Sequence, residues 1–268
     1  MKGKRPIKRR RWMNARRSLA ALTAFATLGL SLGAAAHAAA RPQLCASARA
    51  EMAKSADVAA AMTAAFGRLP MRAAGDAVSP CIHPVKYIHF AAAELLLTIA
   101  QDPDTACHGC GAMLSGYFFR RENGALKLIN RTPNFVEIGS NGLPGAITPI
   151  GFAGDDAIVV EGGGTFQGYT STSAALVVFR AGRAVNLTPK DFIPLSADDS
   201  DAKVDGGAVS VDAKWSVASP TSADFVVDYV VEAQGHKGAA RAVWSERGDK
   251  LTVTSGAVPK EWAEASGQ

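Results

Sequence analysis

The sequence lacks the short motifs of the common enzyme classes. It contains no Gly-x-Ser-x-Gly elbow, no His-Glu-x-x-His helix, no Walker loop and no dinucleotide-binding fingerprint. No nucleophile lies at a recognisable spacing from a general base. Because catalytic groups often come from distant parts of a chain, these absences argue against an enzyme without excluding one. We therefore expect no catalytic residues and no cofactor.

Acidic residues are absent from the first forty positions. Residues 1–40 contain nine of the 29 Lys and Arg residues of the chain and no Asp or Glu. The remaining 20 basic residues face 24 acidic ones, which gives residues 41–268 a net charge of −4. A mildly acidic domain has no electrostatic means of holding a polyphosphate backbone, so nucleic acid is not an expected partner.

Long apolar runs are absent outside the N-terminal region. There, a basic stretch ending at Arg17 is followed by an apolar stretch from Ser18 to Ala36 and then by small residues. This layout is typical of a secretory signal peptide over residues 1–40, and the Arg pair that begins at Arg16 resembles a twin-arginine signal. The apolar stretch is nearly long enough for an uncleaved anchor, so we expect membrane contact only if the signal is not removed. The mature protein is expected to be periplasmic or secreted.

Cysteines are scarce, and all four lie after the expected signal peptide. An even number of cysteines in an exported protein predicts disulfides, with three possible connectivities. We favour a Cys45–Cys81 bridge, which would tie the N-terminal segment to the rest of the chain. The second favoured bridge is Cys107–Cys110, because these residues are close in sequence. One alternative is a metal site of soft or borderline ligands, formed by Cys81, His83, Cys107 and Cys110. Another is thiol redox chemistry at the Cys107/Cys110 loop, although strands rather than a helix are expected to flank it.

The segment over residues 41–84 is expected to form a helix and a connecting loop. Residues 46 to 66 are rich in Ala and contain no Gly or Pro, which predicts a helix that stops at Gly67. The following residues, 67 to 84, contain several Pro residues and therefore predict a loop.

Residues 85–258 have the pattern of antiparallel β-structure. Apolar runs separated by Gly turns predict a first four-strand unit at residues 86–90, 95–101, 112–121 and 125–130. Similar patterns over residues 151–187 and 215–253 indicate three such units, the alternative being a meander with evenly spaced turns. We expect a mainly β fold, in which an antiparallel meander forms a sandwich or open barrel with the N-terminal helix against it. The tail over residues 259–268 is expected to fray.

Three loops are candidates for ligand binding. If the three units stack, their second loops (the Cys107/Cys110 loop, residues 162–169 and residues 234–238) lie at one edge of the fold. Hydrogen-bonding and aromatic side chains would then gather beside the Gly run at residues 162–164, and these side chains are His108, Gln167, Tyr169 and His236. Such a set suits a sugar or a peptide. The alternative is three unrelated solvated loops whose Gly residues serve turn geometry.

One stretch carries a resemblance. Cys107-His108-Gly109-Cys110, followed by Gly116-Tyr117-Phe118-Phe119 and a Gly hairpin, resembles a motif of exported bacterial β-rich proteins of unknown function. The resemblance covers about residues 95–130 and assigns no role to any residue. The sequence as a whole favours an exported, non-catalytic ligand- or protein-binding module of the cell envelope. The alternative is an envelope protein with a redox or metal site at the Cys107/Cys110 loop.

Overall fold

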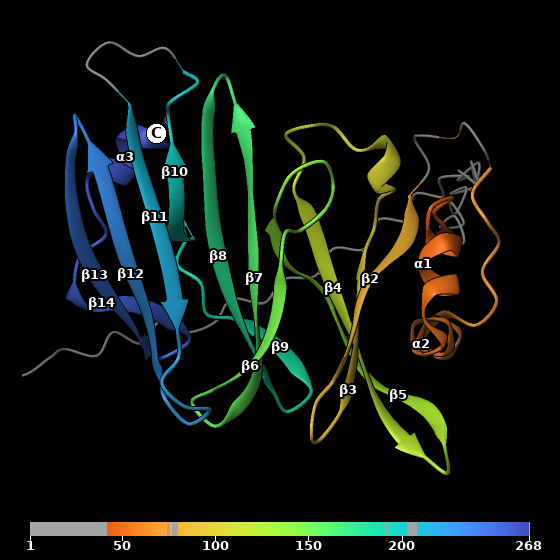
Figure 1. Ribbon diagram of the computed structural model, residues 1–268. Coiled ribbons are helices and arrows are strands. Elements are labelled where there is room, and N and C mark those ends of the chain that lie inside the picture. The colour runs from red at the N-terminus through yellow and green to blue at the C-terminus, as the bar shows by residue number, and fades with distance from the viewer. Residues whose placement is uncertain (1–41, 74–75, 77–79, 191, 203–207, 268) are drawn as a thin grey trace, which may run out of the picture. The chain divides into compact units, whose positions relative to one another are not determined.

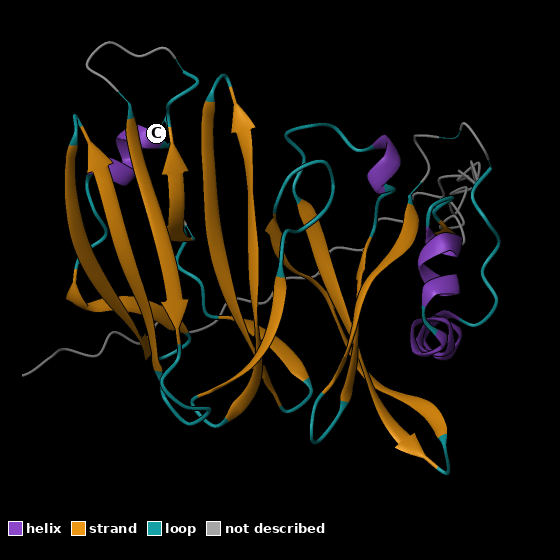
Figure 2. Ribbon diagram, viewed as in Figure 1, coloured by secondary structure: helices purple, strands orange, loops and turns teal. Residues whose placement is uncertain are grey.

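Strands in two sheets make up most of the chain that the computed structural model describes, which is residues 42–73, 76, 80–190, 192–202 and 208–267 (Figure 1). The expected signal peptide over residues 1–40 lies outside these described residues. Figure 2 shows how few helices accompany the strands. The longest helix in the described residues has 11 residues, and none is long and apolar enough to cross a membrane.

The first sheet has five strands in the order β1-β2-β3-β4-β5, and only the β1–β2 pair is parallel. Its strands are β1 (Gln43–Leu44), β2 (Cys81–His89), β3 (Glu94–Ile99), β4 (Ala112–Glu122) and β5 (Ala125–Ile138). A short 3₁₀-helix, η1 (Pro103–Thr105), interrupts the β3–β4 loop. The loop predicted over residues 67–84 therefore ends earlier, because β2 already begins at Cys81.

The predicted N-terminal helix is two helices, α1 (Ala48–Lys54) and α2 (Ala56–Phe66). They separate at Ser55, whose extended backbone (φ −145°) breaks the helical path. The Ser55 side chain accepts a hydrogen bond from the Val58 amide and so caps α2. Met62 of α2 packs with Leu96 and Phe119 of the first sheet. The helices thus cover one face of this sheet, as expected.

The second sheet has nine strands in the order β14-β13-β12-β11-β10-β8-β7-β6, with β9 also paired to β8. Its strands are β6 (Ile147–Phe152), β7 (Asp155–Phe166), β8 (Tyr169–Arg180), β9 (Arg183–Asn186), β10 (Ile193–Asp198), β11 (Val209–Ser216), β12 (Asp224–Ala233), β13 (His236–Arg247) and β14 (Lys250–Gly256). Each strand of β2–β5, β6–β9 and β11–β14 pairs with the next one along the chain. The fold is therefore mainly β and antiparallel, as predicted, and it contains three four-strand meanders.

Strands β7 and β8 are buried on both faces, which explains their continuous apolar runs. Ile158 and Val177 belong to the core that the two sheets share with Leu95 and Phe118. Alternate residues of the same strands, such as Leu176, face a second core. That second core is formed with residues of β11 to β14, so β7 and β8 lie between two apolar layers.

The interval over residues 162–169, expected to be a loop, is a long hairpin instead. Strands β7 and β8 are joined by the two-residue turn Gln167-Gly168, with φ values of 54° and 90°. The Gly run permits close backbone packing: a Cβ on Gly162 would lie 2.5 Å from the Gly139 nitrogen, and one on Gly163 would lie 2.0 Å from the Ser171 oxygen. These glycines are required by neighbouring backbone rather than by a loop.

The prediction that the C-terminal tail frays is wrong. It forms a short helix, α3 (Glu261–Ala265), that packs against the second sheet. Trp262 is only 6% exposed and Ala265 is fully buried in the second core. Because these residues are three apart, they share one face of the helix and dock together.

Candidate binding site

The four cysteines form the two favoured pairs, Cys45–Cys81 and Cys107–Cys110. Their Cα–Cα distances are 4.9 Å and 5.1 Å. The bridged sulfurs offer no thiolate, so the alternative metal set with His83 stays a prediction that requires both bridges to be reduced. Strand β4 rather than a helix follows the Cys107/Cys110 loop.

His108 connects this disulfide loop to the β7–β8 hairpin. Its Nε2 donates to the carbonyl oxygen of Thr165 at 3.0 Å, and its Nδ1 lies 3.1 Å from Oδ1 of Asn141. The ring also lies 5.5 Å from the ring of Phe166, which is 47% exposed. Both ring nitrogens therefore lie within hydrogen-bond distance of protein atoms. His108 thus links the disulfide loop to Asn141 and to the β7–β8 hairpin.

Gln167 is the first residue of the turn in this hairpin, and Tyr169 follows the turn and pairs with Phe166. A Cβ on Gly267 would lie 2.9 Å from the Tyr169 ring, so this ring packs closely against the C-terminal segment. Three of the four candidate ligand-binding residues are thus grouped around the β7–β8 hairpin and the disulfide loop.

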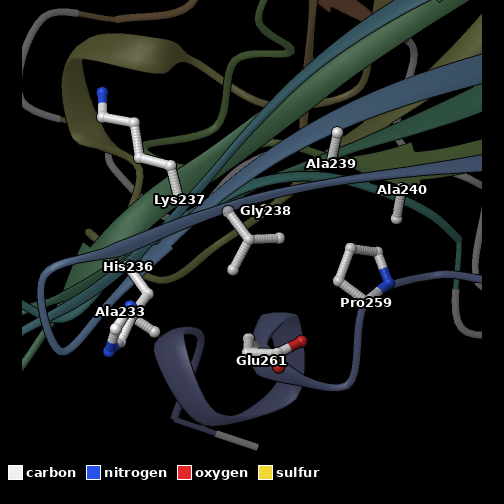
Figure 3. A pocket seen from close by; sticks show the side chains of 9 residues that line it. Ala233, His236, Lys237, Gly238, Ala239, Ala240, Pro259 and Glu261 are labelled. Carbon is white, nitrogen blue, oxygen red and sulfur yellow. The ribbon is translucent and has the colours of Figure 1, made fainter.

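His236 lies elsewhere, in a groove of about 320 Å³ between β13 and the segment that leads into α3 (Figure 3). The groove is lined by Val231, Ala233, His236, Lys237, Gly238, Ala239, Ala240, Pro259 and Glu261. His108, Gln167 and Tyr169 are not part of this lining. A site shared by all four residues therefore stays a prediction, and the groove at His236 is a candidate in its own right.

The groove follows a strand edge that β14 does not cover. Strand β13 pairs with β12 along its length from His236 to Ser245. Strand β14 pairs with β13 only from Ala242 to Arg247. The chain then turns away after Ala257, whose amide bonds the Arg241 carbonyl, and residues 236–240 of β13 are left as an open edge.

The hairpin geometry identifies which backbone groups face this open edge. The two-residue turn makes Ala233 and His236 a hydrogen-bonded pair. Because such pairs alternate with non-hydrogen-bonded ones, Lys237, Ala239 and Arg241 of β13 direct their N–H and C=O groups away from β12. The Arg241 carbonyl does point away from β12, because it accepts a hydrogen bond at 3.0 Å from the amide of Ala257, which follows β14. Within the described residues, the outward N–H and C=O groups of Lys237 and Ala239 have no such partner.

Side chains divide between the two faces of this edge. Lys237 and Ala239 extend away from Glu261 and Pro259 (Figure 3). Lys237 is directly opposite Glu232 on β12 and forms an ion pair with it. The other face carries small residues, and a Cβ on Gly238 would meet no atom within 4 Å. The edge therefore combines unpaired backbone groups with open space for side chains of another chain.

Comparisons with models of protein families, with curated proteins and with solved structures found no match to this chain.

Proposed function

We propose that the protein is an exported, non-catalytic binding module of the cell envelope that captures an extended peptide segment along the open edge of β13. The observation that carries this proposal is the row of unpaired backbone groups at Lys237 and Ala239, beside a groove. An extended peptide can satisfy such groups by adding a strand to the sheet, with side-chain pockets supplying specificity. A sugar would not match a repeating row of donors and acceptors.

Two further features support export. Residues 1–40 have the layout of a signal peptide, and the two disulfides are typical of proteins from oxidising compartments.

The test is a selection of peptides from a displayed random library on the purified, fully oxidised protein. We expect peptides that bind with micromolar affinity and that protect the Lys237 and Ala239 amides from hydrogen exchange. Gly238→Val adds a branched side chain to the groove lining, with its Cβ in space where no atom lies within 4 Å, and should weaken binding at least about tenfold.

Ala239→Pro is a second variant, because it removes one outward N–H while the pairing of β13 with β12 is retained. The matched control is Val253→Pro on β14, which removes an outward N–H from a different strand edge. Unchanged circular dichroism establishes folding in each case. If the selected peptides bind wild type, Gly238→Val and Ala239→Pro equally well, or if no peptide binds, the proposed function is wrong.

A further inference from the structure

A second cavity, separate from the β13 groove, has a volume of about 290 Å³. It lies where α1, β2, η1 and the loop before β6 meet. Its lining combines polar and apolar side chains, namely Ser47, Glu51, His83, Pro84, Val85, Pro103, Asp104 and Leu143. Buried polar groups from three segments lie next to this lining.

Asp102 anchors these buried groups and is only 2% exposed. It accepts hydrogen bonds from Arg72 Nη2 at 2.8 Å and from Ser47 Oγ at 2.7 Å. Burial pushes the pKa of Asp102 up, but its hydrogen-bond donors and the Arg72 charge outweigh burial and hold the pKa below its usual value. Asp102 is therefore ionised, and the Arg72–Asp102 pair contributes no net charge to the cavity.

His83 stands between this ion pair and the cavity and is only 6% exposed. Its Nδ1 lies 2.9 Å from Ser47 Oγ. Ser47 has one hydroxyl proton and donates it to the ionised Asp102, so the Nδ1–H of His83 must be the donor to Ser47. Burial lowers the pKa of His83, although Glu51, Asp102 and Asp104 act to raise it. The ring is therefore neutral near pH 7, and its Nε2 carries a lone pair.

That lone pair has no hydrogen-bond partner within the described residues, although the side chain is more than nine-tenths buried. Nε2 is therefore an unpaired hydrogen-bond acceptor on a side chain that lines the cavity. Two carboxylates, those of Glu51 and Asp104, line the same cavity. The cation paired with Glu51 is the exposed Lys54, at 2.6 Å. Acceptors and negative charge thus dominate the polar part of the lining.

The rest of the lining is apolar. Pro84, Val85, Pro103 and Leu143 form it. A site with an apolar wall, negative charge and a neutral acceptor is complementary to an alkyl chain that ends in a positively charged donor. We infer that this cavity binds an organic cation, an ammonium group on an alkyl chain, whose N–H groups donate to His83 Nε2 and to the carboxylates of Glu51 and Asp104.

A metal ion fits the cavity less well. Within the described residues, one group of potential ligand atoms lies within 4.8 Å of one another, and it consists of Cys45, Cys81 and Asp102. Both sulfurs of that group are bridged, and Asp102 already pairs with Arg72. The ligand atoms of His83, Glu51 and Asp104 are not clustered in this way, and apolar walls offer nothing to a bare ion.

The ammonium has two possible sources, a lysine side chain of a partner protein and a free alkylamine. Titrations with 1,5-diaminopentane and with N-acetyl-lysine N-methylamide, followed by calorimetry and by the His83 ring resonances, distinguish them. We expect one site with a Kd below about 1 mM for at least one probe. Tighter binding of the lysine derivative identifies a protein partner, and tighter binding of the diamine identifies a small-molecule ligand. Uncharged 1-pentanol should bind at least about tenfold more weakly.

The decisive variant is Glu51→Gln combined with Asp104→Asn. It should weaken amine binding at least about tenfold, because the cavity loses both charges. The matched control is Asp212→Asn combined with Asp249→Asn, which removes the same charge from two exposed positions and should leave binding unchanged. Equal binding by the two double variants, or no amine binding at 10 mM, overturns the inference.

A Zn²⁺ titration completes the test. Micromolar Zn²⁺ binding that depends on His83, without amine binding, would make the cavity a metal site and would also overturn the inference. The inference does not rest on the peptide edge of β13, because Gly238→Val should leave amine binding at wild-type strength. Failure of one proposal is therefore distinguishable from failure of the other.

Discussion

The first meander, β2–β5, and the third meander, β11–β14, are stabilised in different ways. The first is braced by both disulfides and by the buried Arg72–Asp102 ion pair. The third contains none of the four cysteines and packs large aromatic side chains, including Phe225, Tyr229 and Trp244, in its core.

The connections explain this difference. The strands β3 and β4 are separated by residues 100–111, and the N-terminal helices join β2 through a further loop. By contrast, β12 and β13 are joined by the two-residue turn Gln234-Gly235. Long irregular connections lose more entropy when they are ordered than tight turns do. Disulfides and a buried ion pair thus stabilise the part of the molecule whose connections are least regular, and apolar packing suffices where the connections are tight turns.

The largest expected effect comes from the core of the third meander. Phe225 is fully buried and stacks on Trp215, with ring centroids 5.4 Å apart. Phe225→Ala should lower the free energy of unfolding by about 3–5 kcal/mol, because it creates a cavity in a packed core. Chemical denaturation measures this loss. Measured against wild type under the same condition, the loss should be the same with and without reductant. A loss that depends on reductant would show that the third meander is not stabilised independently of the disulfides.

Removal of the Cys45–Cys81 bridge should have the next largest effect. The bridge closes a loop with a sequence separation of 36. On the chain-entropy model, replacing both cysteines by Ala should lower the free energy of unfolding by about 3–4 kcal/mol. Hydrogen exchange should then increase in α1, α2 and β2 more than in β11–β14. Equal exchange increases in both meanders would show that the first meander is not separately braced.

Much of this fold could be predicted from the sequence. Gly turns between apolar runs located most strands, and the short separation of Cys107 from Cys110 indicated their pairing. Other features depended on packing between distant segments. The glycines at residues 162–164 indicate a loop, but they lie in a strand, where the backbone of Gly139 approaches Gly162 and the backbone of Ser171 approaches Gly163. The tail over residues 259–268 is predicted to fray, yet α3 buries Trp262 against the second sheet.

The candidate sites were harder to predict than the fold. The loop at residues 234–238 indicates His236, but the open edge beside it depends on where β14 leaves β13, and no local pattern gives that position. The cavity at His83 was missed for a similar reason. Ser47, His83 and Asp102 come from three separate segments, and only the completed first sheet brings them within hydrogen-bond distance. In the sequence, His83 is marked only by the Pro that follows it, and its burial becomes apparent in the folded chain.

The smallest expected effect is a pH dependence of stability that originates in the first meander. Burial lowers the pKa of His83 in the folded protein, against the opposing effects of Glu51, Asp102 and Asp104. The unfolded chain therefore binds a proton at a higher pH than the folded chain does. The stabilisation by neutral His83 is complete above the unfolded pKa, near 6.5, and is lost as the pH falls from there through the folded pKa.

Thermal unfolding between pH 7.5 and pH 5 measures this dependence. His83→Gln should flatten the decline in melting temperature on acidification, because Gln takes up no proton. His236→Gln is the matched control, since His236 is exposed in the third meander, and it should leave the decline unchanged. If the decline in melting temperature persists in His83→Gln and disappears in His236→Gln, the acid-sensitive group lies in the third meander and not in the first.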